Sequence, residues 1–200
     1  MRSEDDAQDD FGHLFNLVFE AVTEGVRDYF RDHPAVNHKH SMGTRRGATR
    51  DYIVDRLRAA IGGVSGIHIS DKNQTVNFGI QSRYLGRVHK LCEKLSATLG
   101  HTQAALAFQD NDAEAALGEG FEEATCIRIG YVPLPADPMN PRIFITCPVG
   151  KQNAWKIELR RAEGAADVGI EPVEPLDPMP DETGDMVEVI RDPVRKGDEE

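Results

Sequence analysis

The sequence predicts an α+β protein built on a mainly antiparallel sheet, with a hairpin and a three-stranded meander in the sheet and helices on one of its faces. Apolar residues recur at three- and four-residue steps in several segments, which is typical of amphipathic helices. Short apolar runs bounded by turn residues are typical of strands. The last three of these runs have short connections, which favours antiparallel pairing. The length of 200 residues suits one domain with an appendage.

The first third of the chain predicts two helices. Apolar residues at helical spacing predict a helix over residues 10–32. It ends before Pro34, because the residue that precedes a proline avoids the α region. A second helix is expected over residues 49–61, followed by Gly62 and Gly63. The segment 36–49 between the two helices is expected to be a loop.

Strand-like runs dominate the rest of the domain. The expected strands are residues 67–70, 75–80, 124–132, 142–147 and 154–159, and the first two form a hairpin. On the last strand Trp155 alternates with Ile157 and Leu159, so we expect these three side chains in the core.

The secondary structure of three further segments is predicted as helical or is ambiguous. The apolar spacing over residues 83–99 predicts a helix with Gly100 as its C-cap. Residues 102–108 fit either a helix or a strand, and residues 111–117 fit a short helix at most.

Charge is unevenly distributed along the chain. The net charge is −11, yet residues 11–161 hold 16 acids and 19 bases. Residues 1–10 hold 5 acids and 1 base, and residues 162–200 hold 13 acids and 3 bases. We therefore expect an acidic flexible arm over 1–10, a single α+β domain over 11–161 and a disordered acidic tail over 162–200. Such an arm either serves only to solvate the protein or docks on a basic face, its own or a partner's.

The composition limits the cellular compartment and the classes of enzyme that the sequence could encode. No apolar run reaches the roughly 18 to 20 residues needed to cross a bilayer, and the acidic N-terminus is unlike a secretory signal. Cys92, Cys126 and Cys147 are expected to be free thiols in a reducing compartment, so we expect a cytoplasmic protein. The motifs G-x-S-x-G, H-E-x-x-H and the Walker pattern are absent. We expect no cofactor, and whether the protein is an enzyme stays open.

A basic segment between the first two predicted helices is the main candidate for function. Paired arginines beside histidines suit a phosphate-bearing ligand or an acidic partner, whereas the alternative is a solvated loop. His38 and His40 could be metal ligands or an acid/base pair, but no third ligand lies near them and we expect no metal. The candidate binding residues here are His38, Lys39, His40, Arg45, Arg46 and Arg50.

A family resemblance extends over residues 11–161. It rests on the segment 75–91, on His101-Thr102-Gln103, on Ile129-Gly130-Tyr131-Val132 and on Ile145-Thr146-Cys147-Pro148 followed by Trp155 and an acidic tail. This pattern resembles small bacterial and prophage proteins encoded beside a helix-turn-helix regulator with an ImmA/IrrE-like metallopeptidase domain, as in phage-defence modules of the RosmerTA kind. Relatives carry a basic run that is here partly kept as Arg87 and Lys90, which join the candidate binding residues.

The resemblance implies the toxin-like component of a toxin–antitoxin or phage-defence module, controlled by binding the regulator encoded nearby. Its partner would be a protein, and the acidic tail would form part of the contact. The alternative is a small enzyme that acts on nucleic acid or a nucleotide through His38, His40, Arg45 and Arg46, helped by Lys90.

Overall fold

The computed structural model describes residues 1–34, 39–72, 75–98, 102–117, 121 and 123–161. The predicted tail 162–200 and His38 lie outside these residues. The helices are α1 (Glu4–Phe11), the 3-10 turn η1 (Gly12–Leu14), α2 (Phe15–Asp32), α3 (Met42–Ile61), α4 (Gln103–Gln109) and α5 (Ala113–Leu117). The strands are β1 (Ile67–Lys72), β2 (Thr75–Ile80), β3 (Tyr84–Lys90), β4 (Thr125–Val132), β5 (Arg142–Val149) and β6 (Gln152–Leu159).

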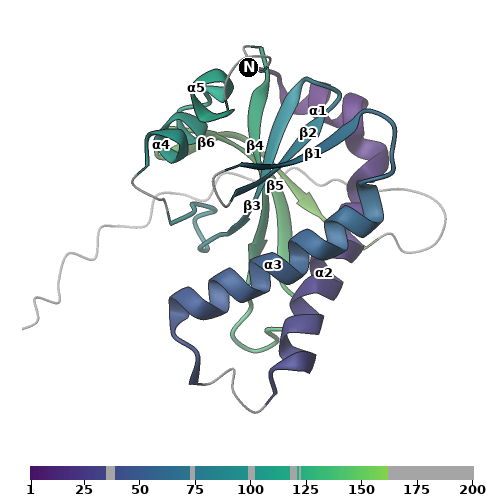
Figure 1. The fold of residues 1–200 in the computed structure, drawn as a ribbon, viewed down its shortest axis with the longest axis vertical. Helices are drawn as coiled ribbons and strands as arrows, with labels where there is room; N and C mark the ends of the chain where they lie inside the picture. Colours follow the sequence, from purple (N-terminus) through teal and green to yellow (C-terminus); the bar gives the residue numbers. More distant parts are fainter. Residues whose placement is uncertain (35–38, 73–74, 99–101, 118–120, 122, 162–200) are drawn as a thin grey trace, which may run out of the picture.

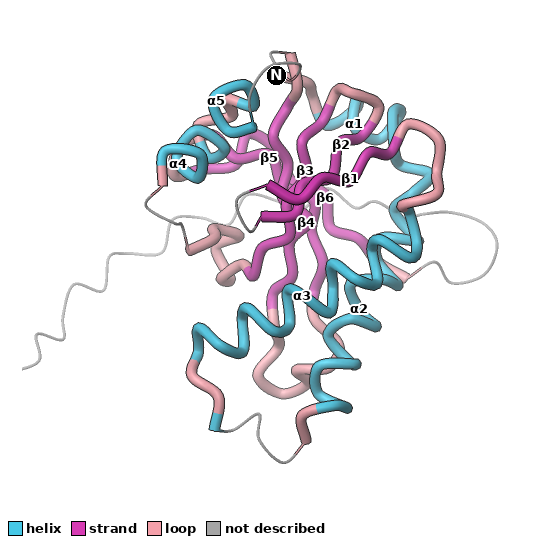
Figure 2. The backbone as a smooth tube through the Cα atoms, viewed as in Figure 1, coloured by secondary structure: helices cyan, strands magenta, loops and turns pink. Residues whose placement is uncertain are grey.

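The strands form one sheet in the order β1-β2-β3-β4-β5-β6 (Figures 1 and 2). Every neighbouring pair is antiparallel except β3 and β4, which run parallel with Tyr84 opposite Thr125. A parallel pair needs a crossover connection, and here the segment with α4 and α5 provides it. The predicted α+β class with a mainly antiparallel sheet is confirmed.

One face of the sheet is covered by α1, α2 and α3 (Figure 1). Phe11, Phe15 and Leu57 are buried there against Tyr84 and Ile127. The two long helices approach closely at Gly25, where an added Cβ would lie 2.6 Å from the Cα of Ile53. A larger side chain at that position would therefore separate α2 from α3.

The short helices α4 and α5 pack on the other face of the sheet. Phe108, Ala113 and Ala116 form a separate apolar cluster with Leu85 of β3 and Cys126 of β4. Successive side chains of a strand point to opposite faces, so central strands with a layer on each side are apolar throughout. The expectation of helices on one face therefore holds for α1 to α3 alone.

The helix predicted over residues 83–99 was wrong, because residues 84–90 form β3. Tyr84 and Val88 face the α2–α3 layer, and Leu85 faces the α4–α5 layer. A strand buried on both faces brings apolar residues three apart in sequence, which imitates helical spacing. The first helix is also divided into α1, η1 and α2, and α3 begins seven residues before the expected start.

The flexible arm predicted over residues 1–10 was wrong as well. Ser3 caps α1, and Ala7 and Phe11 are buried. Asp10 accepts hydrogen bonds from Arg83 Nη1 at 2.6 Å and from the Tyr84 hydroxyl at 3.0 Å. Most acids of this segment face outward and Asp10 binds β3, while Ala7 is buried in the core, so the segment belongs to the folded domain.

Among the described helices, none combines the length and the apolar character needed to cross a bilayer.

Candidate functional site: a basic cleft at the start of α3

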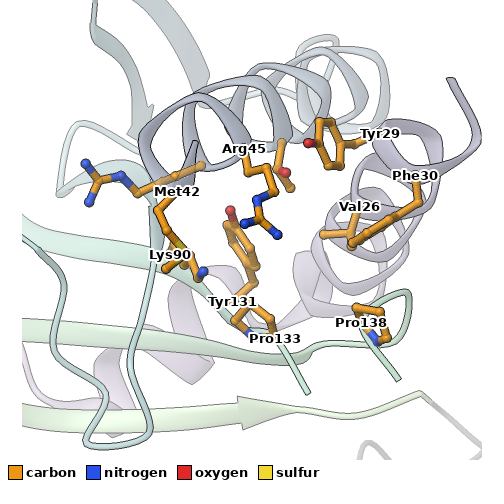
Figure 3. A pocket seen from close by; sticks show the side chains of 11 residues that line it. Val26, Tyr29, Phe30, Met42, Arg45, Lys90, Tyr131, Pro133 and Pro138 are labelled. Atoms are coloured by element: carbon orange, nitrogen blue, oxygen red, sulfur yellow. The ribbon is translucent and has the colours of Figure 1, made fainter. Parts of the chain in front are cut away.

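A pocket of about 160 Å³ lies between the end of α2, the first turns of α3 and the ends of β3 and β4 (Figure 3). Arg45 and Arg46 come from α3, Lys90 from the last position of β3, and Tyr131 from β4. Tyr29 of α2 forms the opposite wall, and the loop between β4 and β5 closes one side with two prolines.

A second pocket of about 520 Å³ adjoins the first. Met42, Arg46 and Lys90 line both pockets, so the two form a continuous depression, which we call the basic cleft. Its far wall is the segment that follows β3, including Cys92 and Ser96. Leu91 anchors that segment against Gly130, where an added Cβ would lie 2.3 Å from Leu91 Cδ1.

Three cations, Arg45, Arg46 and Lys90, converge on the basic cleft. No carboxylate lines either pocket among the described residues, and none of them forms an ion pair with Arg45, Arg46 or Lys90. The Nε of Arg45 is buried and has no hydrogen-bond partner within the described part of the chain. Burial lowers the pKa of Lys90, and repulsion by Arg45 and Arg46 lowers it further. The cleft thus has a positive charge that an anionic ligand would neutralise.

The cleft also contains two phenol groups, those of Tyr29 and Tyr131. Burial raises the pKa of Tyr131 and that of Tyr29, so both hydroxyls are protonated at neutral pH. The Tyr29 hydroxyl lies 3.0 Å from Nδ1 of His40, just before the Ser41 cap of α3. His40 also lies against the His33 ring, with the ring centroids 5.5 Å apart. His40 therefore positions a cleft residue and does not itself line the cleft.

Apart from His40, the predicted binding residues that the structure describes fall into three groups. Arg45, Arg46 and Lys90 line the cleft together. Lys39 is exposed outside it, and Arg50 is ion-paired with Asp51 at 2.9 Å. The third group consists of Arg87, which points to the opposite face of the sheet.

Arg87 is buried beneath α4 and α5. Its Nε donates to Asn77 Oδ1 at 2.8 Å, and its Nη2 donates to the carbonyl of Ala116 at 3.2 Å. Its guanidinium lies 4.4 Å from the centre of the Phe108 ring. Arg87 therefore fastens the crossover helices to the sheet, which is a structural role.

Sequence reasoning missed the phenols and the thiol of the cleft. Tyr29 and Tyr131 lie on apolar faces of their elements, so their spacing resembles that of ordinary core residues. Cys92 is exposed, and its Sγ lies 2.9 Å from the hydroxyl of Ser96. Burial raises the pKa of Cys92, but hydrogen bonds from the Ser96 hydroxyl and from backbone N–H groups outweigh it and lower the pKa overall. These features depend on the turn after β3, which has no recognisable sequence pattern.

The described residues contain no group of three or more His, Cys, Asp or Glu placed to hold a metal ion. His38, which was considered as a metal ligand, lies outside them.

Comparisons of the chain with protein-family models, with curated proteins and with solved structures found no match.

Proposed function

We propose that the protein binds a phosphate-bearing small molecule, such as a nucleotide, in the basic cleft. The observation that carries this proposal is the convergence of Arg45, Arg46 and Lys90 with no carboxylate among the described lining residues. Guanidinium groups bind phosphate oxygens in pairs, and a lysine adds a compact point charge. The three cations repel one another, and a bound anion would relieve that repulsion.

The remainder of the cleft suits an organic group attached to the phosphate. The larger pocket, about 520 Å³, falls within the range of roughly 300 to 1,000 Å³ that small-molecule sites occupy. Phe30, Met42, Pro133 and Pro138 supply apolar surface beside the cations. Tyr29 and Tyr131 supply neutral hydroxyl groups that can form hydrogen bonds with a ligand. The combination favours a phosphate ester over a free inorganic anion.

Calorimetric titration tests the proposal with mononucleotides and inorganic pyrophosphate as probes. Arg46→Gln and Lys90→Gln should each weaken binding by about tenfold or more, because a charge-assisted hydrogen bond contributes roughly 1.5 to 3 kcal/mol. Arg50→Gln is the matched control, since Arg50 lies on the same helix but pairs with Asp51 outside the cleft. Equal losses in all three variants, or no binding by the unaltered protein, would overturn the proposal.

The toxin-like role in a two-gene module, controlled by a helix-turn-helix metallopeptidase-type regulator, remains a proposal that rests on the sequence resemblance. Induced expression should then arrest bacterial growth, and coexpression of the neighbouring regulator should restore it. Loss of the arrest in Lys90→Gln, with unchanged protein level, would connect this role to the basic cleft. Growth that continues at full expression of the unaltered chain would contradict the toxin-like role.

The enzymatic alternative is tested with the same preparations. Hydrolysis of RNA, DNA or nucleotides that disappears in His40→Ala would support it, because His40 is hydrogen-bonded to the cleft residue Tyr29. Binding without turnover would favour a ligand-binding protein.

A further inference from the structure

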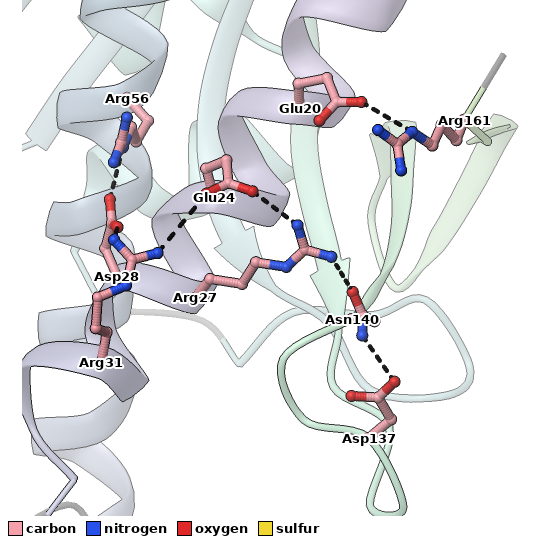
Figure 4. A network of polar contacts seen from close by, with 9 residues as sticks. All are labelled: Glu20, Glu24, Arg27, Asp28, Arg31, Arg56, Asp137, Asn140 and Arg161. Carbon is pink, nitrogen blue, oxygen red and sulfur yellow. Dashed lines mark hydrogen bonds and ion pairs between the residues drawn. The ribbon is translucent and has the colours of Figure 1, made fainter.

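The described chain ends next to α2, the helix that forms one wall of the basic cleft. Arg161 lies next to α2, with its Nε 3.5 Å from Oε1 of Glu20 (Figure 4). A pocket of about 140 Å³ at this point is lined by Thr23 and Arg27 of α2 and by Asn140 of the β4–β5 loop. The same helix and the same loop form the wall of the basic cleft through Val26 and Pro138. The described chain therefore ends next to the helix that borders the cleft.

These 39 residues are long enough and acidic enough to occupy the cleft. They carry 13 acids and 3 bases. An extended chain spans about 3.3 to 3.6 Å per residue, so the length far exceeds the radius of gyration of roughly 15 Å expected for a domain of this size. A tethered segment also acts at an effective concentration on the order of millimolar.

The cleft is the part of the helical layer that offers cations without acidic partners. On α2 and α3, five arginines form ion pairs, namely Arg27, Arg31, Arg50, Arg56 and Arg58. Figure 4 shows that Glu24 and Asp28 of α2 bind three of them: Arg27 and Arg31 on the same helix and Arg56 on α3. Arg45 and Arg46, the remaining arginines of these helices, have no carboxylate partner among the described residues and face the cleft with Lys90.

We infer that the acidic segment 162–200 binds the basic cleft of its own chain and competes there with other anions. Its carboxylates neutralise Arg45, Arg46 and Lys90 when no ligand is present. The contact is electrostatic, so it weakens as salt rises. A free phosphate-bearing ligand must displace the segment, which lowers the apparent affinity of the cleft. This inference concerns the same cleft as the proposed function but depends on its charge and not on the identity of its ligand.

Carbodiimide cross-linking of the full chain tests the contact directly, because the reagent joins a lysine amine to a carboxylate that touches it. At low salt, Lys90 should be joined to an acid within 162–200, and the product should disappear at 1 M salt. Lys151, which is exposed in the β5–β6 turn and lines neither pocket of the cleft, is the control amine. Equal cross-linking of Lys90 and Lys151, or none at Lys90, would overturn the inference. A mixture of ¹⁵N-labelled and unlabelled protein must give products within one chain; products between chains would also overturn it.

A variant of the full chain provides the second readout. We would replace five tail acids by their amides: Glu171→Gln, Glu174→Gln, Asp177→Asn, Asp181→Asn and Glu182→Gln. The Lys90 cross-link should fall several-fold, and the affinity for pyrophosphate or a nucleotide should rise several-fold. An unchanged cross-link would contradict the inference. If no phosphate ligand binds either protein, the proposed function fails, while the cross-link still decides whether the acidic segment occupies the cleft.

Discussion

The indole Nε1 of Trp155 donates a hydrogen bond of 2.9 Å to the backbone carbonyl of Arg2, so the last strand of the sheet holds the first residues of the chain. The Trp155 side chain is 9% exposed and shares its face of β6 with Ile157 and Leu159. The prediction of a core tryptophan is confirmed. The hydrogen bond adds a partner that the sequence pattern did not reveal.

Trp155→Ala should destabilise the domain by about 3 to 5 kcal/mol, because truncating a buried aromatic side chain leaves a cavity. Trp155→Phe keeps most of the apolar contact and removes only the hydrogen bond, so the loss should be about 1 kcal/mol. Urea unfolding of both variants measures the difference. A loss below 1 kcal/mol in Trp155→Ala would contradict the core assignment.

Arg87→Met should loosen the crossover helices while leaving the basic cleft intact. The substitution keeps an apolar stem over Phe108 but leaves Asn77 Oδ1 and the Ala116 carbonyl without their donor. Unsatisfied buried acceptors cost about 1 to 3 kcal/mol each. Hydrogen exchange should therefore quicken over residues 103–117 with little change in α2 and α3. Loss of ligand binding at unchanged stability would instead restore Arg87 to the binding residues.

The ion pair between Asp28 and Arg56 makes stability depend on pH. Arg56 Nε donates to Asp28 Oδ2 at 2.6 Å, and this bond lowers the pKa of the Asp28 carboxyl below its ordinary 3.8. A depressed pKa in the folded state stabilises the protein above the unfolded value, and that contribution is lost as pH falls through the folded value.

Asp28→Asn should accordingly be less stable than the unaltered protein at pH 7, by about 1 kcal/mol because Arg56 is half exposed. The difference should shrink below pH 3.8 and vanish at lower pH. Denaturation midpoints at pH 7 and pH 3 measure it, with the exposed pair variant Asp51→Asn as the control. A constant difference at both pH values would show that the ion pair is not responsible.

The three thiols should differ sharply in reactivity. Burial raises the pKa of Cys126 to about 12 and that of Cys147 to about 11. Cys92 is exposed, and its pKa is lowered overall. Iodoacetamide at pH 8 should therefore label Cys92 alone in the folded protein, as read by mass spectrometry. Ser96→Ala should slow that labelling, because it removes the hydroxyl 2.9 Å from the sulfur. Labelling of Cys126 at a similar rate would contradict the buried assignment.

How far the sequence predicted the fold depended on how each element is buried. β5 and β6 lie near one edge of the sheet and are flanked by clear turns, so their bounds were predicted within a few residues. β3 lies between two layers, and its apolar residues on both faces imitate a helix. α3 has few apolar residues in its first turns, so its start at the Ser41 cap was not recognised.

The sequence predicted only the part of the candidate site that lies within one short segment. Arg45 and Arg46 could be recognised from the sequence because they are adjacent arginines in one short basic segment. Lys90 comes from a strand far along the chain, and its proximity to them depends on that strand's place in the sheet, whereas the apolar spacing predicted a helix there. Tyr29 and Tyr131 could not be distinguished from core residues, since a buried phenol and a cleft phenol occupy the same positions of an apolar pattern.

The parallel pairing of β3 with β4 has a consequence for the order of folding. β1 to β3 and β4 to β6 each form from hairpins, whose contacts are local and close quickly. The seam between β3 and β4 must wait until the intervening crossover has closed, which costs loop entropy before any contact is gained. The basic cleft spans this seam, with Lys90 on one half and Tyr131 on the other. The cleft therefore forms only when the two halves of the sheet have joined, so a folding intermediate would lack it.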